Sequence, residues 1–472
     1  MSERVAIAIL AAGKGTRLHS ARAKVLHEIG GKPLLRHVID TALGVAAAKD
    51  IFVIVGHQAQ AVEDAVGETG VSFVLQADQR GTGHAVQMLR DEWWSQGQQY
   101  DDLLVLSGDV PLLALSTLDA LRDFHLREKA AMTILTALPE DPTGYGRILR
   151  PKPGSAEVAA IVEQKSLTAE QLNLQLREIN SGIYAFQTRP LFDHLDEVTA
   201  ANASGEYYLT DMAALLVKAG ERVVALAAPR TEEVLGANTI AEMMQLDATM
   251  RADKAKALMA AGVTIFAPET CVIDADVVVG ADTVLEPFVQ LRGKTVVGSG
   301  CTIRSYSVVQ NSSLGDGGLI RNSCVLDGAV VEKGAQIGPF AHLRPDSRIG
   351  ADARVGNFVE TKATTLGVGA KANHLSYLGD AEVGDGANIG AGTITCNYDG
   401  VNKNKTKIGA GAFVGSDSAL VAPVTIGDGA YVAAGSVVTE DVPADALAIG
   451  RSRQVNKVGW AAARRLKKPS SK

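Results

Sequence analysis

Small aliphatic residues recur at every sixth position through much of residues 278–438. Val279, Leu285, Leu291 and Val297 are four successive members of this series, and a glycine often follows the aliphatic residue, as Gly298 does. A period of six fits neither an α-helix nor a plain strand. It predicts a short strand followed by a tight turn, stacked coil on coil as a parallel β-helix. The aliphatic side chain points to the axis of the coil, and the glycine lets the backbone turn where a side chain would clash.

The phase of this repeat is not constant, and polar residues gather where it changes. It slips by one residue near Leu314, Val331, Leu366 and Val383, and it shifts again after Thr395. The slips alone are compatible with irregularities of the wall. However, the polar segments 357–362, 373–380 and 388–393 lie in the same stretch, and the wall of a packed coil needs none of them. Residues 396–407 are predicted to be a loop that leaves the coil.

The first 240 residues follow a different pattern, in which apolar runs alternate with helical stretches. In the stretch 33–48, Leu35, Val38, Ile39, Ala42 and Leu43 form a stripe at helical spacing. Such alternation predicts an α/β domain with a mostly parallel sheet and helices on both faces. Ligands then bind beyond the carboxyl ends of the strands. The predicted strands are residues 5–10, 51–55, 71–75, 103–106 and 132–138.

An alanine-rich segment separates the two patterns. Residues 241–262 are predicted to form one long helix, a rigid spacer that starts at a capping box formed by Thr239 and Glu242. The predicted organisation is therefore residues 1–240, a helical linker 241–261, and residues 262–472. The last of these ends in a basic tail over residues 464–469.

Composition excludes some functions and favours a compartment. The chain has 46 Lys and Arg against 53 Asp and Glu, so its net charge of −7 argues against nucleic-acid binding. The four cysteines have no CxxC spacing, which is typical of a reducing compartment. No basic-then-apolar leader pattern and no apolar run of bilayer length is present in the sequence. We therefore expect a cytoplasmic location and no membrane partner.

A glycine-rich loop, LAAGKGTRL, follows the first predicted strand at residues 10–18. Small residues let backbone N–H groups approach phosphate oxygens, and the start of a following helix adds positive potential. No Gly-Lys-Ser/Thr closes the loop, and Leu18 stands where the third glycine of a dinucleotide-binding loop belongs. Phosphate binding is thus favoured over a plain tight turn. The candidate residues are Leu10, Ala11, Ala12 and Gly13.

Three segments of this half resemble the sugar-1-phosphate nucleotidyltransferases, in the order expected for that family. They are the glycine-rich loop together with Lys24-Val25-Leu26, the segment 80–85 with the preceding Gln76, and the segment 107–112. One departure is Ala23, because the family usually has proline before the lysine. The resemblance implies a Rossmann-like domain that binds a nucleotide, and it includes Gly81 and Thr82 among the binding residues.

The chemistry of uridylyl transfer assigns roles within these segments. Several negative charges meet when UTP reacts with a sugar phosphate, and Arg17 and Lys24 are suited to neutralise them. Asp109 follows a predicted strand, where a carboxylate can hold Mg²⁺ beside phosphate oxygens. The resemblance adds Asn238 as the second metal ligand and nucleotide contact. For both residues the alternative is a helix cap. The resemblance also implies that Gly146, Glu163 and Asn180 hold the sugar.

Taken together, residues 5–460 resemble the bacterial bifunctional N-acetylglucosamine-1-phosphate uridyltransferase/glucosamine-1-phosphate N-acetyltransferase family. The segments 373–380 and 389–400 are more specific for it than the hexapeptide period. This resemblance implies a left-handed β-helix with three strands per coil, assembled as a homotrimer. It also implies two reactions. Acetyl-CoA acetylates glucosamine-1-phosphate, and UTP then transfers UMP to N-acetylglucosamine-1-phosphate, with release of pyrophosphate.

The same resemblance assigns the second site. His374 is the expected general base, which accepts the proton of the glucosamine amine as that amine attacks the thioester. Arg344 and Lys362 are expected to bind the sugar phosphate, and Tyr377 and Asn388 to complete the sugar site. Without the resemblance, a structural histidine and a solvated wall are the alternatives. The expected acetyl-CoA residues are Ala391, Asn397, Tyr398, Ser416, Ala434 and Arg451.

Two rival functions are weighed against this one. In the first, the chain is a nucleotidyltransferase with a single activity, and its β-helix serves only oligomerisation or regulation. The polar residues around His374 argue against it. In the second, the chain is a trimeric scaffold with no enzymatic activity, and its solenoid walls bind a partner. The glycine-rich loop and Asp109 argue against that.

Overall fold

The computed structural model describes residues 4–152, 154–169, 171, 176–202 and 204–466. The chain divides into two compact units, Met1–Arg251 and Ala252–Lys472, and each is described by itself. The boundary between the units lies inside one helix, α8 (Ile240–Ala260).

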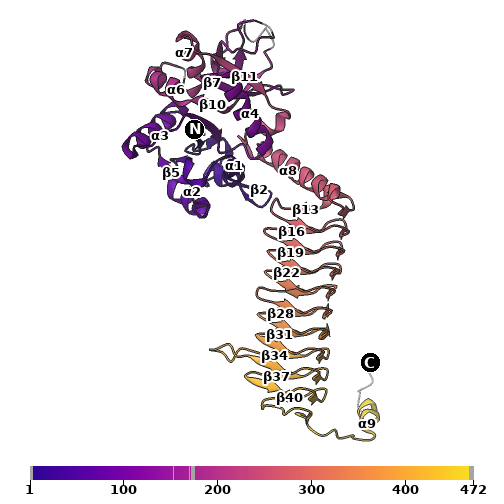
Figure 1. Ribbon diagram of the computed structural model, residues 1–472. Coiled ribbons are helices and arrows are strands. Elements are labelled where there is room, and N and C mark those ends of the chain that lie inside the picture. The colour runs from indigo at the N-terminus through magenta and orange to yellow at the C-terminus, as the bar shows by residue number, and fades with distance from the viewer. Residues whose placement is uncertain (1–3, 153, 170, 172–175, 203, 467–472) are drawn as a thin grey trace. The chain divides into compact units, whose positions relative to one another are not determined.

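A mixed sheet forms the centre of the first unit (Figure 1). All five apolar runs predicted as strands are strands, and β1 lies between β4 and β6, parallel to both. β10 was not predicted, and it is antiparallel to its neighbours β6 and β7. Its sequence, INSGIYAFQ, contains polar residues and an irregular register, so it lacks a clear apolar run. The main strand order is β11 (Val223–Ala227), β7 (Met132–Ala137), β10 (Ile179–Gln187), β6 (Asp102–Ser107), β1 (Val5–Leu10), β4 (Ile51–Val55) and β5 (Ser72–Leu75), and β8 (Arg147–Leu149) and β9 (Ala160–Val162) extend from β10.

Helices cover both faces of this sheet, as predicted. Along β1, Ala6 and Ala8 belong to one apolar core while Ile7 and Ile9 belong to the other, because successive side chains of a strand point to opposite faces. The predicted helix at 33–48 ends early, at Leu43, because the next residue is a glycine. α3 (Thr82–Gln96), α6 (Thr188–His194) and α7 (Met212–Lys218) pack in the first core, and α1 (Leu34–Leu43), α2 (Ala59–Val66) and α4 (Leu115–Glu128) pack in the second.

The predicted capping box opens α8. The Glu242 N–H donates to Thr239 Oγ1 at 3.2 Å, and the Glu242 carboxylate accepts from the Thr239 N–H at 3.2 Å. Met243 and Leu246 pack with the apolar core of the first unit, whereas Leu258 belongs to the core of the second. The helix predicted over 241–262 is therefore present as one continuous helix, and each of its ends contributes to a different core.

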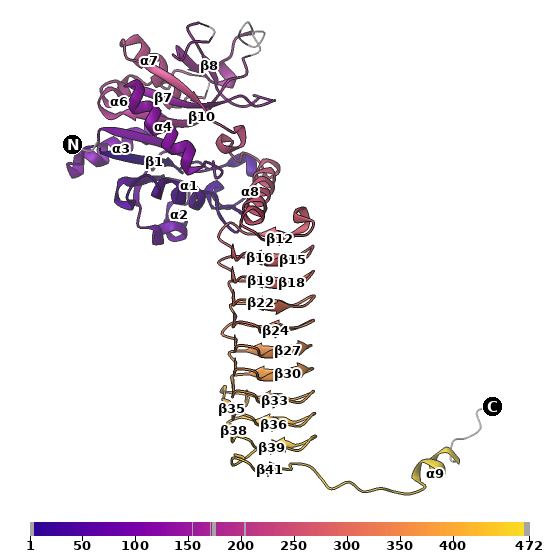
Figure 2. The same cartoon turned by 45° about the vertical axis from the view of Figure 1, so that its right-hand side comes forward.

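The second unit is a parallel β-helix (Figures 1 and 2). Within the described residues its strands form three parallel sheets of 11, 10 and 9 strands. From β12 (Thr264–Ile265) to β40 (Val437–Val438) each strand pairs with the third one along the chain, as β12 pairs with β15 (Val284–Leu285), so each coil has three strands. At the end of the β-helix, β39 (Tyr431–Val432) pairs with β41 (Leu447–Ala448). The β-helix runs from β12 to β41 and exceeds the predicted range 278–438 at both ends.

The strand register explains the phase slips. Val279 pairs with Val297, eighteen residues later, whereas Val297 pairs with Leu314, seventeen residues later. In a coil that is one residue shorter, the inward-facing residue still stacks on the inward-facing residue of the previous coil. The six-residue repeat of the sequence therefore slips by one position there. Val383 pairs with Ile408, twenty-five residues later, and this long coil contains the predicted loop. The loop leaves the coil as a hairpin beside β34 (Ile394–Cys396), with a bridge between Tyr398 and Lys403 (Figure 1).

Glycine is required where successive coils approach closely. A Cβ atom on Gly298 would lie 2.8 Å from the Asp316 nitrogen of the next coil, and one on Gly390 would lie 2.6 Å from the Ser416 nitrogen. The interior itself is filled by aliphatic residues and by the buried, free thiols of Cys271, Cys301 and Cys324. The predicted role of these glycines and the absence of cysteine pairing in the sequence are both confirmed.

Candidate active sites

The glycine-rich loop opens into a cavity of about 630 Å³ beyond the carboxyl ends of β1 and β6. This is where a doubly covered α/β sheet is expected to bind a ligand. The structure thus brings together residues from five separate segments of the sequence. The predicted residues that line the cavity are Leu10, Ala11, Ala12, Gly13, Lys24, Gln76, Gly81, Thr82, Asp109, Glu163 and Asn180.

Two cationic side chains, Arg17 and Lys24, meet the side-chain oxygens of Asp109 and Asn238 at one edge of this cavity. Lys24 Nζ forms an ion pair with the Asp109 carboxylate and donates to Asn238 Oδ1 at 3.1 Å. Arg17 Nη2 donates to the same Asn238 oxygen at 2.8 Å. Arg17 and Asn238 do not line the cavity themselves, but these contacts join them to the residues that do. The predicted charged centre is therefore assembled.

The alternative that Asp109 and Asn238 are helix caps does not fit the structure. No side chain caps the start of α4, the helix that follows Asp109. At the start of α8 the capping side chains are Thr239 and Glu242, and the Asn238 amide oxygen faces Arg17 and Lys24 instead. Carboxylate and amide oxygens are the donors that Mg²⁺ prefers. The oxygens of Asp109 and Asn238 both contact the ammonium group of Lys24, so the position between them favours a cation.

The residues expected to hold the sugar surround one half-buried carboxyl group, that of Glu163. Glu163 Oε1 accepts a hydrogen bond from Thr210 Oγ1 at 3.1 Å, and burial raises the pKa of Glu163 despite this bond. The Asn180 N–H donates to the Gly146 carbonyl at 2.9 Å, and Asn180 Nδ2 donates to the Tyr184 hydroxyl at 2.8 Å. A Cβ atom on Gly146 would lie 3.5 Å from Glu163 Oε1, so the glycine keeps this space narrow but open.

Several residues of this cavity were not predicted. Glu206, Tyr208 and Thr210 line it from the segment that precedes α7, and Gln79 lines it from the segment after β5. No period or spacing in the sequence marks these positions, because each lies in a loop whose path is set by tertiary packing. Tyr184 also lines the cavity, and it lies within the segment that carried the resemblance at Asn180.

His374 ends β30 (Lys371–His374) and is exposed rather than turned into the coil. Its Nδ1 lies 2.6 Å from Asn357 Oδ1, and the two residues are register partners on adjacent coils. Because an amide oxygen can only accept, Nδ1 carries the proton and Nε2 keeps its lone pair. This is the tautomer that a general base requires. Asn357 was predicted only as part of a polar segment, and the seventeen-residue spacing from His374 marks the pair.

Three of the predicted acetyl-CoA residues continue the corner that carries His374 through the next coils. The Asp417 N–H donates to the Ala391 carbonyl and the Gly435 N–H to the Ser416 carbonyl, both at 2.7 Å. A Cβ atom on Gly415 would lie 2.5 Å from the Ala434 nitrogen, and one on Gly435 would lie 3.7 Å from Arg451 Cδ. Neighbouring strands are about 4.8 Å apart, so four coils place the Arg451 level about 19 Å from the His374 level. We name one row the corner column: Asn357, His374, Ala391, Ser416 and Ala434. Arg451 lies beside the end of this row, next to Gly435.

Side-chain size changes along the positions next to the corner column. On the coils up to His374 the adjacent left-handed residues are bulky and exposed, with φ of 55° at Phe340, 57° at Phe358 and 50° at Leu375. On later coils the left-handed residues are Gly392, Asp417 with φ of 56°, and Gly435. Two of these three positions lack a side chain, so the bulky apolar row ends at Leu375.

The two cations expected to bind phosphate are each paired with a carboxylate. Arg344 Nη1 lies 2.9 Å from Glu360 Oε1, and Lys362 Nζ lies 2.9 Å from Asp380 Oδ1. Burial opposes the charge of Asp380, but the hydrogen bonds from Lys362 and Asn397 together with the nearby positive charges outweigh it and lower the pKa of that carboxyl. The Asp380 hydrogen bond correspondingly raises the pKa of Lys362. Each carboxylate thus holds its cation in place.

The remaining predicted residues lie at different distances from this centre. Tyr377 pairs in register with Glu360, next to the two cations, and Asn397 Nδ2 donates to Asp380 Oδ2 at 2.5 Å. Asn388 pairs with Lys371 rather than with His374. Tyr398 lies on the projecting hairpin, where its hydroxyl donates to the Gly400 carbonyl at 2.6 Å. The structure therefore places Tyr377 and Asn397 near the ion pairs of Arg344 and Lys362. It leaves Tyr398 outside the corner column.

Comparison with known proteins decides between the functions considered so far. The family described as MobA-like NTP transferase domain matches residues 7–174, and Bacterial transferase hexapeptide (six repeats) matches residues 276–311, 328–363 and 405–440. "Bifunctional protein GlmU" of Koribacter versatilis (strain Ellin345) is 57% identical over all of this chain and 99% of its own length. The chain belongs to the bifunctional GlmU family.

Two further GlmU relatives match over nearly the whole chain. That of Solibacter usitatus (strain Ellin6076) is 50% identical over 98% of this chain and 98% of its own length. That of Exiguobacterium sp. (strain ATCC BAA-1283 / AT1b) is 47% identical over 97% and 99%. Membership of the GlmU family confirms the left-handed hexapeptide β-helix and the bifunctional transferase of UDP-N-acetylglucosamine synthesis, and it rejects both rival functions. No helix among the described residues has the length and apolar content needed to cross a bilayer.

Proposed function

We propose that each of the two reactions has its own site, one on each unit. The β-helix acetylates glucosamine-1-phosphate beside His374, and the cavity of the first unit transfers UMP from UTP to N-acetylglucosamine-1-phosphate. The observation that carries this proposal is the pair of separate constellations. Asn357 and His374 form one, and Arg17, Lys24, Asp109 and Asn238 form the other.

Acetyl transfer follows from the protonation state of His374. Nε2 of His374 accepts a proton from the amine of the sugar as nitrogen attacks the thioester carbonyl, and the imidazolium returns that proton as the thiolate of CoA leaves. Asn357 keeps Nδ1 protonated, so the basic nitrogen faces the substrate. Arg344 and Lys362 exchange their carboxylate partners for the sugar phosphate. Acetyl-CoA lies along the corner column, with Arg451 toward its phosphates.

Uridylyl transfer is a matter of positioning and charge neutralisation. A phosphate oxygen of the sugar attacks the α-phosphate of UTP, and pyrophosphate leaves in line. Arg17 and Lys24 neutralise the triphosphate, and the backbone of the glycine-rich loop approaches it. Asp109 and Asn238 would hold Mg²⁺, which supplies additional positive charge at the phosphates. Gly146, Glu163 and Asn180 bind the sugar hydroxyls and acetamide.

The proposal includes a homotrimer in the cytoplasm. Hexapeptide β-helices expose a long flat wall, and here two stacked aromatic pairs are exposed on one corner, Phe288 with Tyr306 and Phe340 with Phe358. Contact with a second copy would remove such apolar surface from water. The four free cysteines support a reducing compartment. Light scattering tests the trimer directly.

One pair of substitutions tests the two sites. Purified protein with Mg²⁺, UTP and N-acetylglucosamine-1-phosphate should release pyrophosphate, and with acetyl-CoA and glucosamine-1-phosphate it should release free CoA. His374→Ala should abolish CoA release and leave pyrophosphate release unchanged, while Lys24→Ala should do the reverse. If either substitution abolishes both activities in a folded protein, the two sites are not independent.

A further inference from the structure

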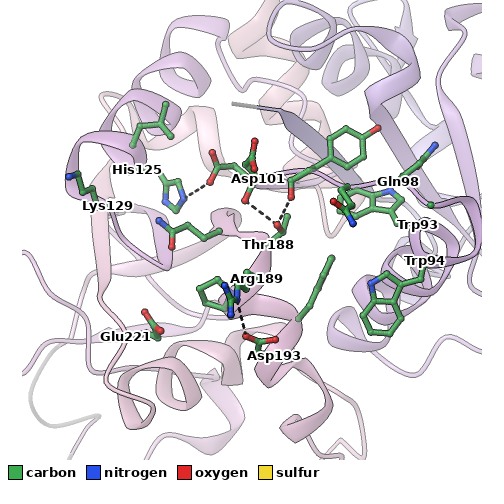
Figure 3. A pocket seen from close by; sticks show the side chains of 18 residues that line it. Trp93, Trp94, Gln98, Asp101, His125, Lys129, Thr188, Arg189, Asp193 and Glu221 are labelled. Carbon is green, nitrogen blue, oxygen red and sulfur yellow. Dashed lines mark hydrogen bonds and ion pairs between the residues drawn. The ribbon is translucent and has the colours of Figure 1, made fainter. Parts of the chain in front are cut away.

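The first unit contains a second and larger cavity, of about 1350 Å³, that neither reaction uses (Figure 3). β6 begins in it at Asp102, whereas Ser107 at the other end of β6 lines the nucleotide cavity. β10, antiparallel to β6, ends in it at Gln187 and lines the nucleotide cavity at Asn180. The two cavities therefore lie at opposite ends of the same two strands. We name the larger one the amino-edge cavity.

Three buried polar atoms in the amino-edge cavity lack a hydrogen-bond partner. They are Trp93 Nε1, Gln98 Oε1 and His125 Nε2. Trp93 is 1% exposed and His125 is 2% exposed, so both are almost completely removed from bulk solvent. His125 Nδ1 is 2.8 Å from Thr133 Oγ1, but its Nε2 is 3.5 Å from Asp102 Oδ1, too far for a good hydrogen bond. Unsatisfied buried donors and acceptors are costly, and these three atoms lie within the wall of the cavity rather than on its accessible surface.

Aromatic rings form one side of the same cavity. Trp93 contacts Tyr100 and Phe192, with ring centroids 4.6 and 5.8 Å apart, and Trp94 lies 6.4 Å from Phe192. These rings already attract cations of the chain itself. The guanidinium of Arg90 lies 4.6 Å from the centroid of Trp94. Aromatic faces of this kind bind either a cation or the C–H face of a sugar ring.

The charges that line the cavity exclude an anion. The carboxylates are Asp101, Asp102, Asp193 and Glu221, against the two cations Lys129 and Arg189. One of these cations already faces a carboxylate, because Arg189 Nε lies 3.9 Å from Asp193 Oδ2. The excess of negative charge repels phosphate, so the amino-edge cavity is not a second site for UTP, for a sugar phosphate or for CoA.

We propose that the amino-edge cavity binds a cationic amino sugar of more than one ring. Its ammonium groups face the carboxylates, and one ring lies on Trp94. Its hydroxyl groups hydrogen-bond with polar side chains that line the cavity, such as Gln99 and Gln187. The cavity is larger than the roughly 300–1,000 Å³ of a typical small-ligand pocket, which favours an oligosaccharide over a single sugar.

Isothermal titration calorimetry of the full-length protein tests this proposal with two matched probes. The first is the β-1,4-linked trimer of glucosamine, and the second is the same trimer with every amine acetylated. The cationic trimer should bind at a single site per chain, at least about tenfold more tightly than the acetylated trimer. Saturating UTP with Mg²⁺ should not displace it, because the two cavities are separate. No binding at millimolar concentration, equal binding of both trimers, or displacement by UTP would overturn the proposal.

Two substitutions locate the binding. Trp94 is 62% exposed and the Asp193 side chain 65% exposed, so Trp94→Ala and Asp193→Asn should leave the fold and both activities intact. Each should weaken binding of the cationic trimer at least about fivefold. Lys362→Ala is the matched control, because it alters the amino-sugar site of the β-helix and should leave this binding unchanged. Binding lost in Lys362→Ala and kept in Trp94→Ala would assign the heat to the acetyltransferase site and refute the amino-edge site.

Discussion

At the scale of single residues, the orientation of His374 depends on one amide. Asn357 Oδ1 accepts from His374 Nδ1, which fixes both the tautomer and the direction of the ring. We expect Asn357→Ala to lower kcat for acetyl transfer by roughly 10- to 100-fold and to leave KM for acetyl-CoA nearly unchanged. Steady-state assays of CoA release measure both constants.

Asn357→Asp is the control for this prediction. A carboxylate still accepts from Nδ1, so most of kcat should return, and the acidic limb of the pH profile should move to higher pH because the negative charge stabilises imidazolium. Equal loss of kcat in both variants, with no change in the pH profile, would show that Asn357 acts only through the fold.

Glu163 gives a prediction that depends on pH. Burial raises its pKa in the folded chain above the unfolded value, so its contribution to stability is present below the unfolded pKa and is lost as pH rises through the folded pKa. Glu163→Gln removes this loss. The variant should therefore gain thermal stability relative to the parent between pH 4 and pH 7, while KM for N-acetylglucosamine-1-phosphate rises roughly tenfold. Differential scanning calorimetry at pH 4 and pH 7 measures the Tm of the variant minus that of the parent, which should increase with pH. A difference that is the same at both pH values would contradict the prediction.

At the scale of elements, the contact between coils determines which glycines are required. A Cβ atom on Gly298 would meet the backbone of the next coil at 2.8 Å, whereas one on Gly318 would meet its nearest atom at 3.3 Å. Gly298→Ala should lower the free energy of unfolding of the β-helix by about 1–3 kcal/mol. Gly318→Ala, in the same β-helix, should cost clearly less. Urea denaturation followed by circular dichroism compares the two, and equal losses would show that the coils separate easily.

The elements also show how far the sequence could predict this structure. Strands β1 and β4 were predictable because their residues are buried on both faces and form unbroken apolar runs. The β-helix was predictable because every coil must stack an aliphatic residue on the previous one. β10 was not, because Asn180-Ser181-Gly182 interrupts its apolar pattern.

The candidate sites were predictable only in part, for a related reason. Lys24 and Asp109 belong to short segments with a recognisable pattern, but Thr210 and Tyr208 reach the cavity from a loop whose path depends on tertiary packing. The partnership of Asn357 with His374 requires the length of one particular coil, seventeen residues rather than eighteen. The amino-edge cavity has no signal in the sequence, because Trp93 and His125 appear there as ordinary apolar-face residues of two helices.

At the scale of the whole molecule, the two proposed reactions differ in their need for a metal ion, and this difference would separate them without any mutation. Asp109 and Asn238 offer hard oxygen donors in the first unit, where we expect the triphosphate to bind. Among the described residues of either unit there is no group of three or more His, Cys, Asp or Glu side chains that could hold a metal by itself. The acetyl transfer that we propose uses His374 and the cations Arg344 and Lys362, and none of its steps involves a metal ion. EDTA should therefore abolish pyrophosphate release and leave CoA release unchanged, and excess Mg²⁺ should restore the former. If EDTA reduced both activities in parallel, the metal would serve the fold or the acetyltransferase site, and the division of chemistry between the two units would be wrong.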